Sequence, residues 1–335
     1  MKEIYNTARN LMGSSCRVCP ICNGKACAGQ VPGMGGLGTG SSFINNVEAL
    51  KNIRFNMRLI HGVIEPDTSV EILGKKMNLP FVAAPIGGIS FNMNDAISET
   101  EYATAIVEGC KAKGIIGCTG DGVPEWLVNA GLDAIKAADG HGIPFIKPWE
   151  DEEFYKKIAL AKATGCDTIG MDIDAAGLIT LREMGRPVSP KPLHELTKII
   201  KNIGMKFILK GVMTPDEAEL AVEAGADAIV VSNHGGRVFD HTPGSAEVLE
   251  SIADRVQGKI TIFVDGGVRT GGDVLKLLAL GADAVMIGRP FSIAAIGGKQ
   301  EGVETYINKI AGELKQAMVL TGTTKASEVS KTILF

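Results

Sequence analysis

From about residue 78, short apolar runs alternate with longer segments in which the apolar residues recur at helical spacing. Most of these runs show no polar alternation, which is typical of strands buried on both faces. The expected strands are Phe81–Ala84, Gly114–Cys118, Pro144–Lys147, Thr168–Asp172, Lys206–Leu209, Ala228–Val231, Thr261–Val264 and Ala284–Ile287. The expected helices are 97–112, 124–131, 151–164, 192–202, 215–224, 244–256, 270–280 and 302–319.

Three of the junctions between a helix and the next strand have the same form, namely VEAGADAIVV, LALGADAVMI and AKATGCDTIGM. Each places glycine just past the helix, where a left-handed cap is favoured, and then begins a buried strand. Repetition of such units predicts an α/β fold, a (β/α)8 TIM barrel. An open doubly wound sheet is the alternative, but the first expected strand leads into APIGGIS and not into G-x-G-x-x-G.

The first 45 residues have a different character. They contain four cysteines and the segment VPGMGGLGTGSS, with neither helix nor strand periodicity. We therefore expect a Cys- and Gly-rich extension over residues 1–45 and a barrel over residues 46–335. GMGGLG in this segment resembles a dinucleotide fingerprint only loosely, because no apolar strand precedes it.

Composition narrows the classes of partner. The formal net charge is −4 and no basic stripe is present, so nucleic acid is not expected to bind. No stretch approaches the roughly 20 apolar residues that a membrane span requires. The N-terminus lacks the apolar core of a secretory signal, so a cytoplasmic location is expected. Glycine is in excess, at 42 of 335 residues, which indicates tight turns or close approaches of backbone to a ligand.

In a barrel of this type, the carboxyl ends of the strands carry the chemistry. The last two expected strands end in VDGGVR and IGRP. Glycines expose backbone N–H groups to an anion, and arginines supply paired donors, so these loops predict a phosphate site. Its residues are Asp265, Gly266, Gly267, Arg269, Gly288 and Arg289.

A second set of polar residues follows three neighbouring strands: Asp172, Lys210, His234 and Arg237. An imidazole can take up a proton near neutral pH, and a carboxylate such as Asp172 could orient it. Arg237 could hold a carboxylate with its planar fork, and Lys210 could stabilise negative charge on a cofactor.

The segments ILKGVMTPDEAELAVEAGADAIVVSNHGGRVFDHTPGSAEVL and FVDGGVRTGGDVLKLLALGADAVMIGRP resemble the FMN-dependent α-hydroxy-acid oxidase/dehydrogenase family. Glycolate oxidase, lactate oxidase and flavocytochrome b2 belong to this group. The resemblance begins near residue 46 and is densest over 205–291. It implies a (β/α)8 barrel, FMN as cofactor, and oxidation of a 2-hydroxy acid to a 2-oxo acid. Relatives in the family are often tetramers, so a homo-oligomer is expected.

The resemblance also implies roles for single residues. His234 is the base, Asp172 its partner, Arg237 the clamp on the substrate carboxylate, and Lys210 a neighbour of the flavin ring. The phosphate-site residues named above surround the ribityl and phosphate groups. The segment that meets the flavin ring comprises Ala84, Pro85, Ile86 and Gly87, and Ser232 belongs to the same cofactor site.

The chain departs from the family where substrate would bind. A family tyrosine near the N-terminus is absent, because no tyrosine lies between Tyr5 and Tyr102, and Gln30 stands near that place. A second family tyrosine, after the third strand, is replaced by Lys147. We therefore expect Gln30 and Lys147 to contact substrate in place of the tyrosines.

The N-terminal cysteines form the pattern Cys16-x2-Cys19-x2-Cys22-x4-Cys27, which is dense enough for a metal site. An iron–sulfur cluster and a structural zinc both fit this spacing, and free thiols or a disulfide are the alternative. Two other functions therefore stand beside hydroxy-acid oxidation: an FMN-dependent isomerase or reductase, and a flavin or metal redox protein that uses this segment. The other three cysteines, Cys110, Cys118 and Cys166, are expected to be buried in the core.

Overall fold

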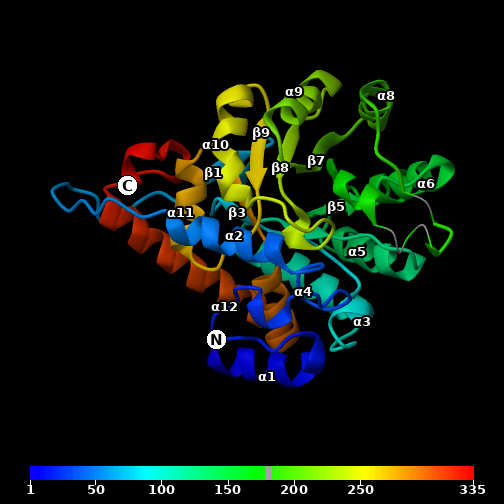
Figure 1. Ribbon diagram of the computed structural model, residues 1–335, viewed down its shortest axis with the longest axis horizontal. Coiled ribbons are helices and arrows are strands. Elements are labelled where there is room, and N and C mark those ends of the chain that lie inside the picture. Colours follow the sequence, from blue (N-terminus) through cyan, green and yellow to red (C-terminus); the bar gives the residue numbers. More distant parts are fainter. Residues whose placement is uncertain (179–180, 182, 187) are drawn as a thin grey trace.

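The computed structural model describes residues 1–178, 181, 183–186 and 188–335 (Figure 1). Eight parallel strands close into a barrel in the order β10-β3-β4-β5-β6-β7-β8-β9, which confirms the expected TIM barrel. The barrel strands are β3 (Phe81–Ile86), β4 (Gly117–Thr119), β5 (Ile143–Ile146), β6 (Thr168–Asp172), β7 (Lys206–Val212), β8 (Ala228–Val231), β9 (Thr261–Val264) and β10 (Ala284–Ile287).

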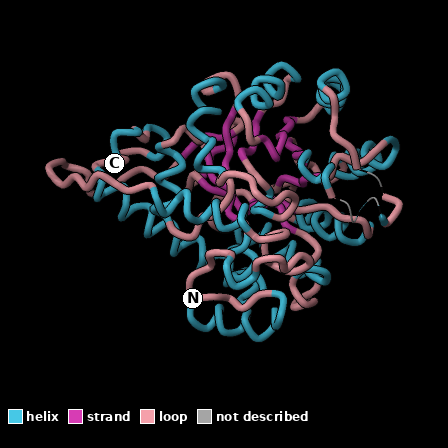
Figure 2. The backbone as a smooth tube through the Cα atoms, in the orientation of Figure 1, coloured by secondary structure: helices cyan, strands magenta, loops and turns pink. Residues whose placement is uncertain are grey.

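Helices surround the strands, which lie together at the centre of the molecule (Figure 2). The helices between and after the strands are α3 (Ile89–Asn92), α4 (Glu99–Ala112), α5 (Glu125–Ala137), α6 (Asp151–Lys162), α8 (Leu193–Ile203), α9 (Pro215–Ala224), α10 (Ser245–Val256), α11 (Gly271–Ala279) and α12 (Arg289–Thr321). Gly225, in the left-handed conformation with φ 88°, ends α9 as the glycine pattern predicted. The three scattered cysteines Cys110, Cys118 and Cys166 are buried, also as expected.

Several elements differ from the expected ones. Helix α5 and strand β7 run further than expected, to Ala137 and Val212. The second strand begins at Gly117 and not at Gly114, because Gly114 has φ 68° and belongs to the turn after α4. The last helix starts at Arg289 and runs to Thr321, with a non-helical residue, Lys299, inside it. An antiparallel hairpin of β1 (Val70–Ile72) and β2 (Lys75–Met77) was not expected. Lys206, at the start of β7, bonds to the hairpin residue Leu73, so the hairpin lies at the amino ends of the strands.

The N-terminal segment packs onto the other end of the barrel. Helix α1 (Lys2–Met12) lies against α12, as Figure 1 shows. Helix α2 (Ser41–Asn52) follows the glycine-rich stretch, and its buried Asn46 donates to the Oδ1 of Asn233 beyond β8. The expected boundary between residues 45 and 46 lies inside α2. In the described part of the chain, no helix is both long and apolar enough to cross a membrane.

Candidate functional site

The loop after β8 turns sharply at the sequence Asn233-His234-Gly235-Gly236. His234, Gly235 and Gly236 all have positive φ, at 56°, 62° and 75°. A side chain at Gly236 would overlap the backbone of Phe43 in α2, so only glycine fits there. The backbone N–H of His234 donates to the Oγ of Ser232 at 3.0 Å. These constraints fix the direction of the imidazole ring at the carboxyl end of the barrel.

The carboxylate in contact with His234 is Asp174, not Asp172 as expected. His234 Nδ1 lies 3.0 Å from Asp174 Oδ1. Burial would raise the pKa of Asp174, but the charges of His234 and Lys210 lower it. Asp174 packs against Gly211, where only glycine fits, because a Cβ at this position would lie 2.7 Å from the Asp174 Cβ. The glycine in the sequence LKG was therefore a signal for this close approach.

Lys210 lies at the centre of a buried charged group. Its ammonium is 3.1 Å from Asp172 Oδ1, 3.9 Å from Asp265 Oδ2 and 3.5 Å from the imidazole Nδ1 of His234. Burial alone would lower the pKa of Lys210, but the three surrounding aspartates, Asp172 first, raise it. The pKa of Asp265 is raised by burial, and Lys210 opposes that rise. Asp172 thus pairs with Lys210 and leaves His234 to Asp174.

Arg237 is half-buried and is tied to the glycine-rich segment. Its Nη1 donates to the carbonyls of Gly33 and Gly35 at 2.5 and 3.2 Å, and its Nη2 donates to Asn92 Oδ1 at 2.9 Å. Burial lowers the pKa of Arg237 to about 10. Asn92 lies at the end of the short helix α3. Nothing in the sequence around it indicated that it contacts Arg237.

Arg269 and Arg289 flank the ring of Phe43. Their guanidinium carbons lie 5.8 and 3.7 Å from the ring centroid. Burial and the nearby charges of Arg237 and Arg269 lower the pKa of Arg289 to about 9. Within the described residues, no carboxylate forms an ion pair with either of these arginines or with Arg237, which leaves three neighbouring cations without an acidic partner.

The two residues expected on the substrate side have different positions. Lys147 follows β5, and its charge helps to lower the pKa of Asp174, so it lies on the same side of the barrel as His234. The side-chain amide of Gln30 accepts a hydrogen bond from Arg17, at 3.1 Å. The Gln30 side chain is thus bonded to Arg17, and the expectation that it contacts substrate is not supported by its position. The groups of this segment that contact Arg237 are the carbonyls of Gly33 and Gly35. The reason is the tight turn in which Gly35 N–H bonds to the carbonyl of Gln30.

The residues expected at the flavin ring lie at the end of β3. Ala84, Pro85 and Ile86 are its last three residues, and the turn that starts at Gly87 follows. The buried carboxylate of Glu99 fixes this turn, because it accepts from the backbone N–H groups of Gly88 and Ile89, both at 2.8 Å.

The residues expected around the phosphate lie at the ends of β9 and β10. Gly288 is the N-cap of the 33-residue helix α12, and no side chain caps that helix end. Gly266 and Gly267 face α2, because side chains there would collide with Asn46. These two glycines therefore serve helix packing, whereas Gly288 and Arg289 leave an open, positively polarised helix end.

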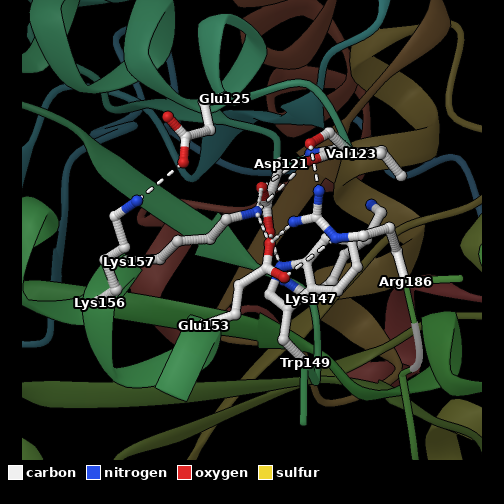
Figure 3. A network of polar contacts seen from close by, with 10 residues as sticks. Asp121, Val123, Glu125, Lys147, Trp149, Glu153, Lys156, Lys157 and Arg186 are labelled. Carbon is white, nitrogen blue, oxygen red and sulfur yellow. Dashed lines mark hydrogen bonds and ion pairs between the residues drawn. The ribbon is translucent and has the colours of Figure 1, made fainter. Parts of the chain in front are cut away.

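A buried network that the sequence did not reveal joins the loops after β4 and β5 (Figure 3). Asp121 Oδ1 accepts from Lys157 at 2.6 Å, and its Oδ2 accepts from the indole of Trp149 at 2.6 Å and from the backbone of Lys147 at 3.0 Å. Arg186 bonds to Glu153, which also pairs with Lys157. The network fixes the backbone of Lys147. Its members are far apart in sequence, so no local pattern could indicate it.

The unpaired polar and cationic groups of the site match the groups that FMN would offer them. Three cationic side chains lack an acidic partner, as described above, and the N-terminus of α12 lacks a cap. Among the residues that the structure describes, several buried oxygens find no hydrogen-bond partner: Ser90 Oγ, Asp174 Oδ2 and Asp265 Oδ1. Buried polar groups of a native protein normally have partners. A ligand with an anionic phosphate and a polar, hydrogen-bonding ring would supply them.

Comparison with known proteins agrees with this fit. A profile described as FMN-dependent dehydrogenase matches residues 33–191 and 185–335. L-lactate oxidase of Lactobacillus jensenii is 32% identical over 319 residues, which cover 85% of this chain and 76% of that protein. Human 2-hydroxyacid oxidase 2 is 29% identical, with 87% and 88% covered. The crystal structure of mandelate oxidase superposes with a TM-score of 0.81 and 26% identity, and covers 100% of this chain and 97% of the other.

Proposed function

We infer the reaction from the premise that this chain belongs to the FMN-dependent dehydrogenase family. It is an FMN-dependent oxidoreductase that acts on the CH–OH group of a 2-hydroxy acid. We propose that His234, Asp174, Lys210 and Arg237 perform this reaction, with Lys147 as a further contact for substrate. The observation that carries the assignment is the His234–Asp174 contact beside the buried Lys210.

His234 acts as the base. Its Nδ1 is held by Asp174, so Nε2 is the nitrogen that can take a proton from substrate. Lys210 lies 3.5 Å from the ring, and Asp174, which holds Nδ1, stabilises the imidazolium once it forms. Bound FMN supplies the acceptor for the hydride equivalent that leaves the substrate carbon. Lys210, which lies beside the base, would stabilise the negative charge that the cofactor gains in the reaction.

Arg237 holds the substrate carboxylate. Its Nη1 and Nη2 already bond to the glycine-rich segment and to Asn92, so this segment fixes the guanidinium plane. The Nε hydrogen and the one remaining Nη2 hydrogen are then available for a carboxylate. Lys147 adds a point charge from the end of β5. The glycine-rich segment stands where the family has a tyrosine, so the substrate is enclosed here by backbone.

An anaerobic screen of 2-hydroxy acids, read as bleaching of the flavin absorbance, tests the proposal. At least one acid should bleach the wild-type protein, while the His234→Ala variant should keep FMN and lose bleaching. Failure of every acid, or unchanged bleaching in the variant, would refute it. Bleaching also separates this reaction from the isomerase alternative, which involves no net oxidation of a hydroxy acid.

We also propose that the chain forms a homo-oligomer. Four large apolar side chains on one short connection are exposed: Met57, Leu59, Ile60 and Ile64. A concentration of apolar surface of this kind is typical of a contact between subunits. A tetramer and a cytoplasmic location stay predictions.

A further inference from the structure

The four N-terminal cysteines play no part in the reaction proposed above, yet the fold brings them together. Cys16, Cys19, Cys22 and Cys27 line one cavity, together with Met34 of the glycine-rich segment and Arg289 and Ile293 of α12. All four are free thiols and each is half-buried.

The backbone between Cys16 and Cys19 has an uncommon conformation. Val18, between Cys16 and Cys19, has φ 43°, a conformation that a β-branched residue rarely adopts. Its N–H donates to Cys16 Sγ at 3.4 Å. Such N–H to sulfur hydrogen bonds accompany thiolates that bind metal clusters and tune their potentials.

Positive charge surrounds the cavity. Arg269 Nη2 donates to Cys22 Sγ at 3.4 Å, and its Nε donates to the Cys22 carbonyl at 3.1 Å. Arg289, which lines the cavity, is held by the carbonyls of Met34 and Gly35 at 2.7 and 3.0 Å. Neither arginine pairs with a carboxylate within the described residues. A group held by four thiolates carries net negative charge, so these two cations complement it.

The spacing of the sulfurs distinguishes two kinds of metal centre. Zinc binds thiolates at about 2.3 Å in a tetrahedron, which places the sulfurs about 3.8 Å apart. Among the described residues, no three of these cysteine sulfurs lie within 4.8 Å of one another. An iron–sulfur cluster distributes its four thiolates over separate iron atoms and therefore requires wider spacing.

We propose that Cys16, Cys19, Cys22 and Cys27 hold a [4Fe–4S] cluster in this cavity, beside the arginines that bind the flavin phosphate. The matched family profile begins at residue 33, so the cluster segment precedes the region that this profile matches. The cluster would transfer electrons out of the enzyme. The two electrons from each hydroxy acid leave one at a time to a one-electron carrier, and the two protons pass to solvent. This role rests on the proposed function, whereas the cluster itself does not.

Iron, acid-labile sulfide and zinc in the FMN-loaded, full-length protein, prepared without oxygen, test the site. We expect about four iron and four sulfide per chain, with a paramagnetic signal after reduction by dithionite. Cys22→Ser should lose at least about nine-tenths of the iron, while Cys166→Ser, a change at a buried cysteine of the core, should keep it.

Three results would overturn the proposal: iron at background after anaerobic incubation with ferrous iron and sulfide, one zinc per chain in its place, or full iron in the Cys16→Ser, Cys22→Ser double variant. FMN content measures folding in each variant. If a variant loses FMN as well, the paramagnetic signal of the wild-type protein decides. Flavin bleaching by a hydroxy acid without iron would refute the cluster but not the oxidation, so the two failures can be told apart.

Discussion

His234 Nδ1 lies 3.0 Å from Asp174 Oδ1, although Asp172, the last residue of β6, was the expected partner. The register of the barrel explains this. Asp172 and Lys210 are direct partners on the adjacent strands β6 and β7, so their side chains meet. His234 lies beyond the end of β8, at the level of the short 3-10 turn that carries Asp174.

Asp174→Asn should lower the rate of flavin reduction by about 10²- to 10⁴-fold, the range ascribed to general base catalysis. The amide can still meet the imidazole but cannot stabilise its positive charge. Single-turnover reduction without oxygen measures the effect. Asp172→Asn is the matched comparison and should cost less in this step. A larger loss in Asp172→Asn than in Asp174→Asn would contradict the assignment.

Arg237→Lys should raise KM for a 2-hydroxy acid by about tenfold or more, which corresponds to about 1.4 kcal/mol, since lysine cannot form the paired bonds of a guanidinium. For the matching 2-hydroxy amide, which lacks the carboxylate charge, the KM values of the variant and the wild-type protein should differ much less. Equal changes for acid and amide would show that Arg237 does not bind the carboxylate.

Lys210→Met should destabilise the fold by about 3–5 kcal/mol near neutral pH, because it leaves buried carboxylates without their cation. Lys210 lowers the pKa of Asp174 and opposes the rise that burial causes in the pKa of Asp265, so its removal raises both folded-state pKa values. Stability is then retained at low pH and lost as pH rises through the raised values. Thermal unfolding should therefore show a smaller deficit near about pH 5 than near about pH 8. Lys210→Arg, which keeps the charge, should flatten this dependence.

Gly35→Ala should disrupt the cysteine segment. A Cβ at this position would overlap the carbonyl oxygen of Cys27 and lie 2.9 Å from that of Gln30, so the chain must shift. We expect faster proteolysis of residues 13–40 and weaker binding of FMN. The control is Gly312→Ala in α12, where a Cβ meets nothing within 4 Å. That change should stabilise the protein by about 0.5–1 kcal/mol. Equal behaviour of the two variants would contradict this account.

Ile60→Glu should reduce the size of the assembly in solution. Ile60 is fully exposed in the single chain, so the change should leave the barrel and its FMN unaffected. Sedimentation is expected to give a multiple of 35.2 kDa for the wild-type protein and a shift toward 35.2 kDa for the variant. A wild-type protein that sediments as a single chain would refute the proposed contact.

The sequence by itself determined the barrel and the positions of its chemical groups along the strands. Eight apolar runs and the helices between them indicate which residues stand at or near strand ends, because burial on both faces leaves few polar positions inside a strand. His234, Lys210 and Arg237 were identified in this way. The glycine excess was also informative, since Gly211 and Gly236 stand where backbone or side chains pack too closely for a Cβ.

Only the tertiary structure decided which of these groups meet. The pairing of Asp174 with His234 depends on strand register and on the height of each loop above the barrel, and neither is local in sequence. The same is true of Asn92, of the Asp121–Lys157–Trp149 network, and of the glycine-rich segment on Arg237. The cysteine spacing indicated a metal site, but the approach of α12 alone brings Arg289 to its cavity. Contacts between residues tens to hundreds of positions apart are set by the closed fold, and a periodic pattern along the chain does not encode them.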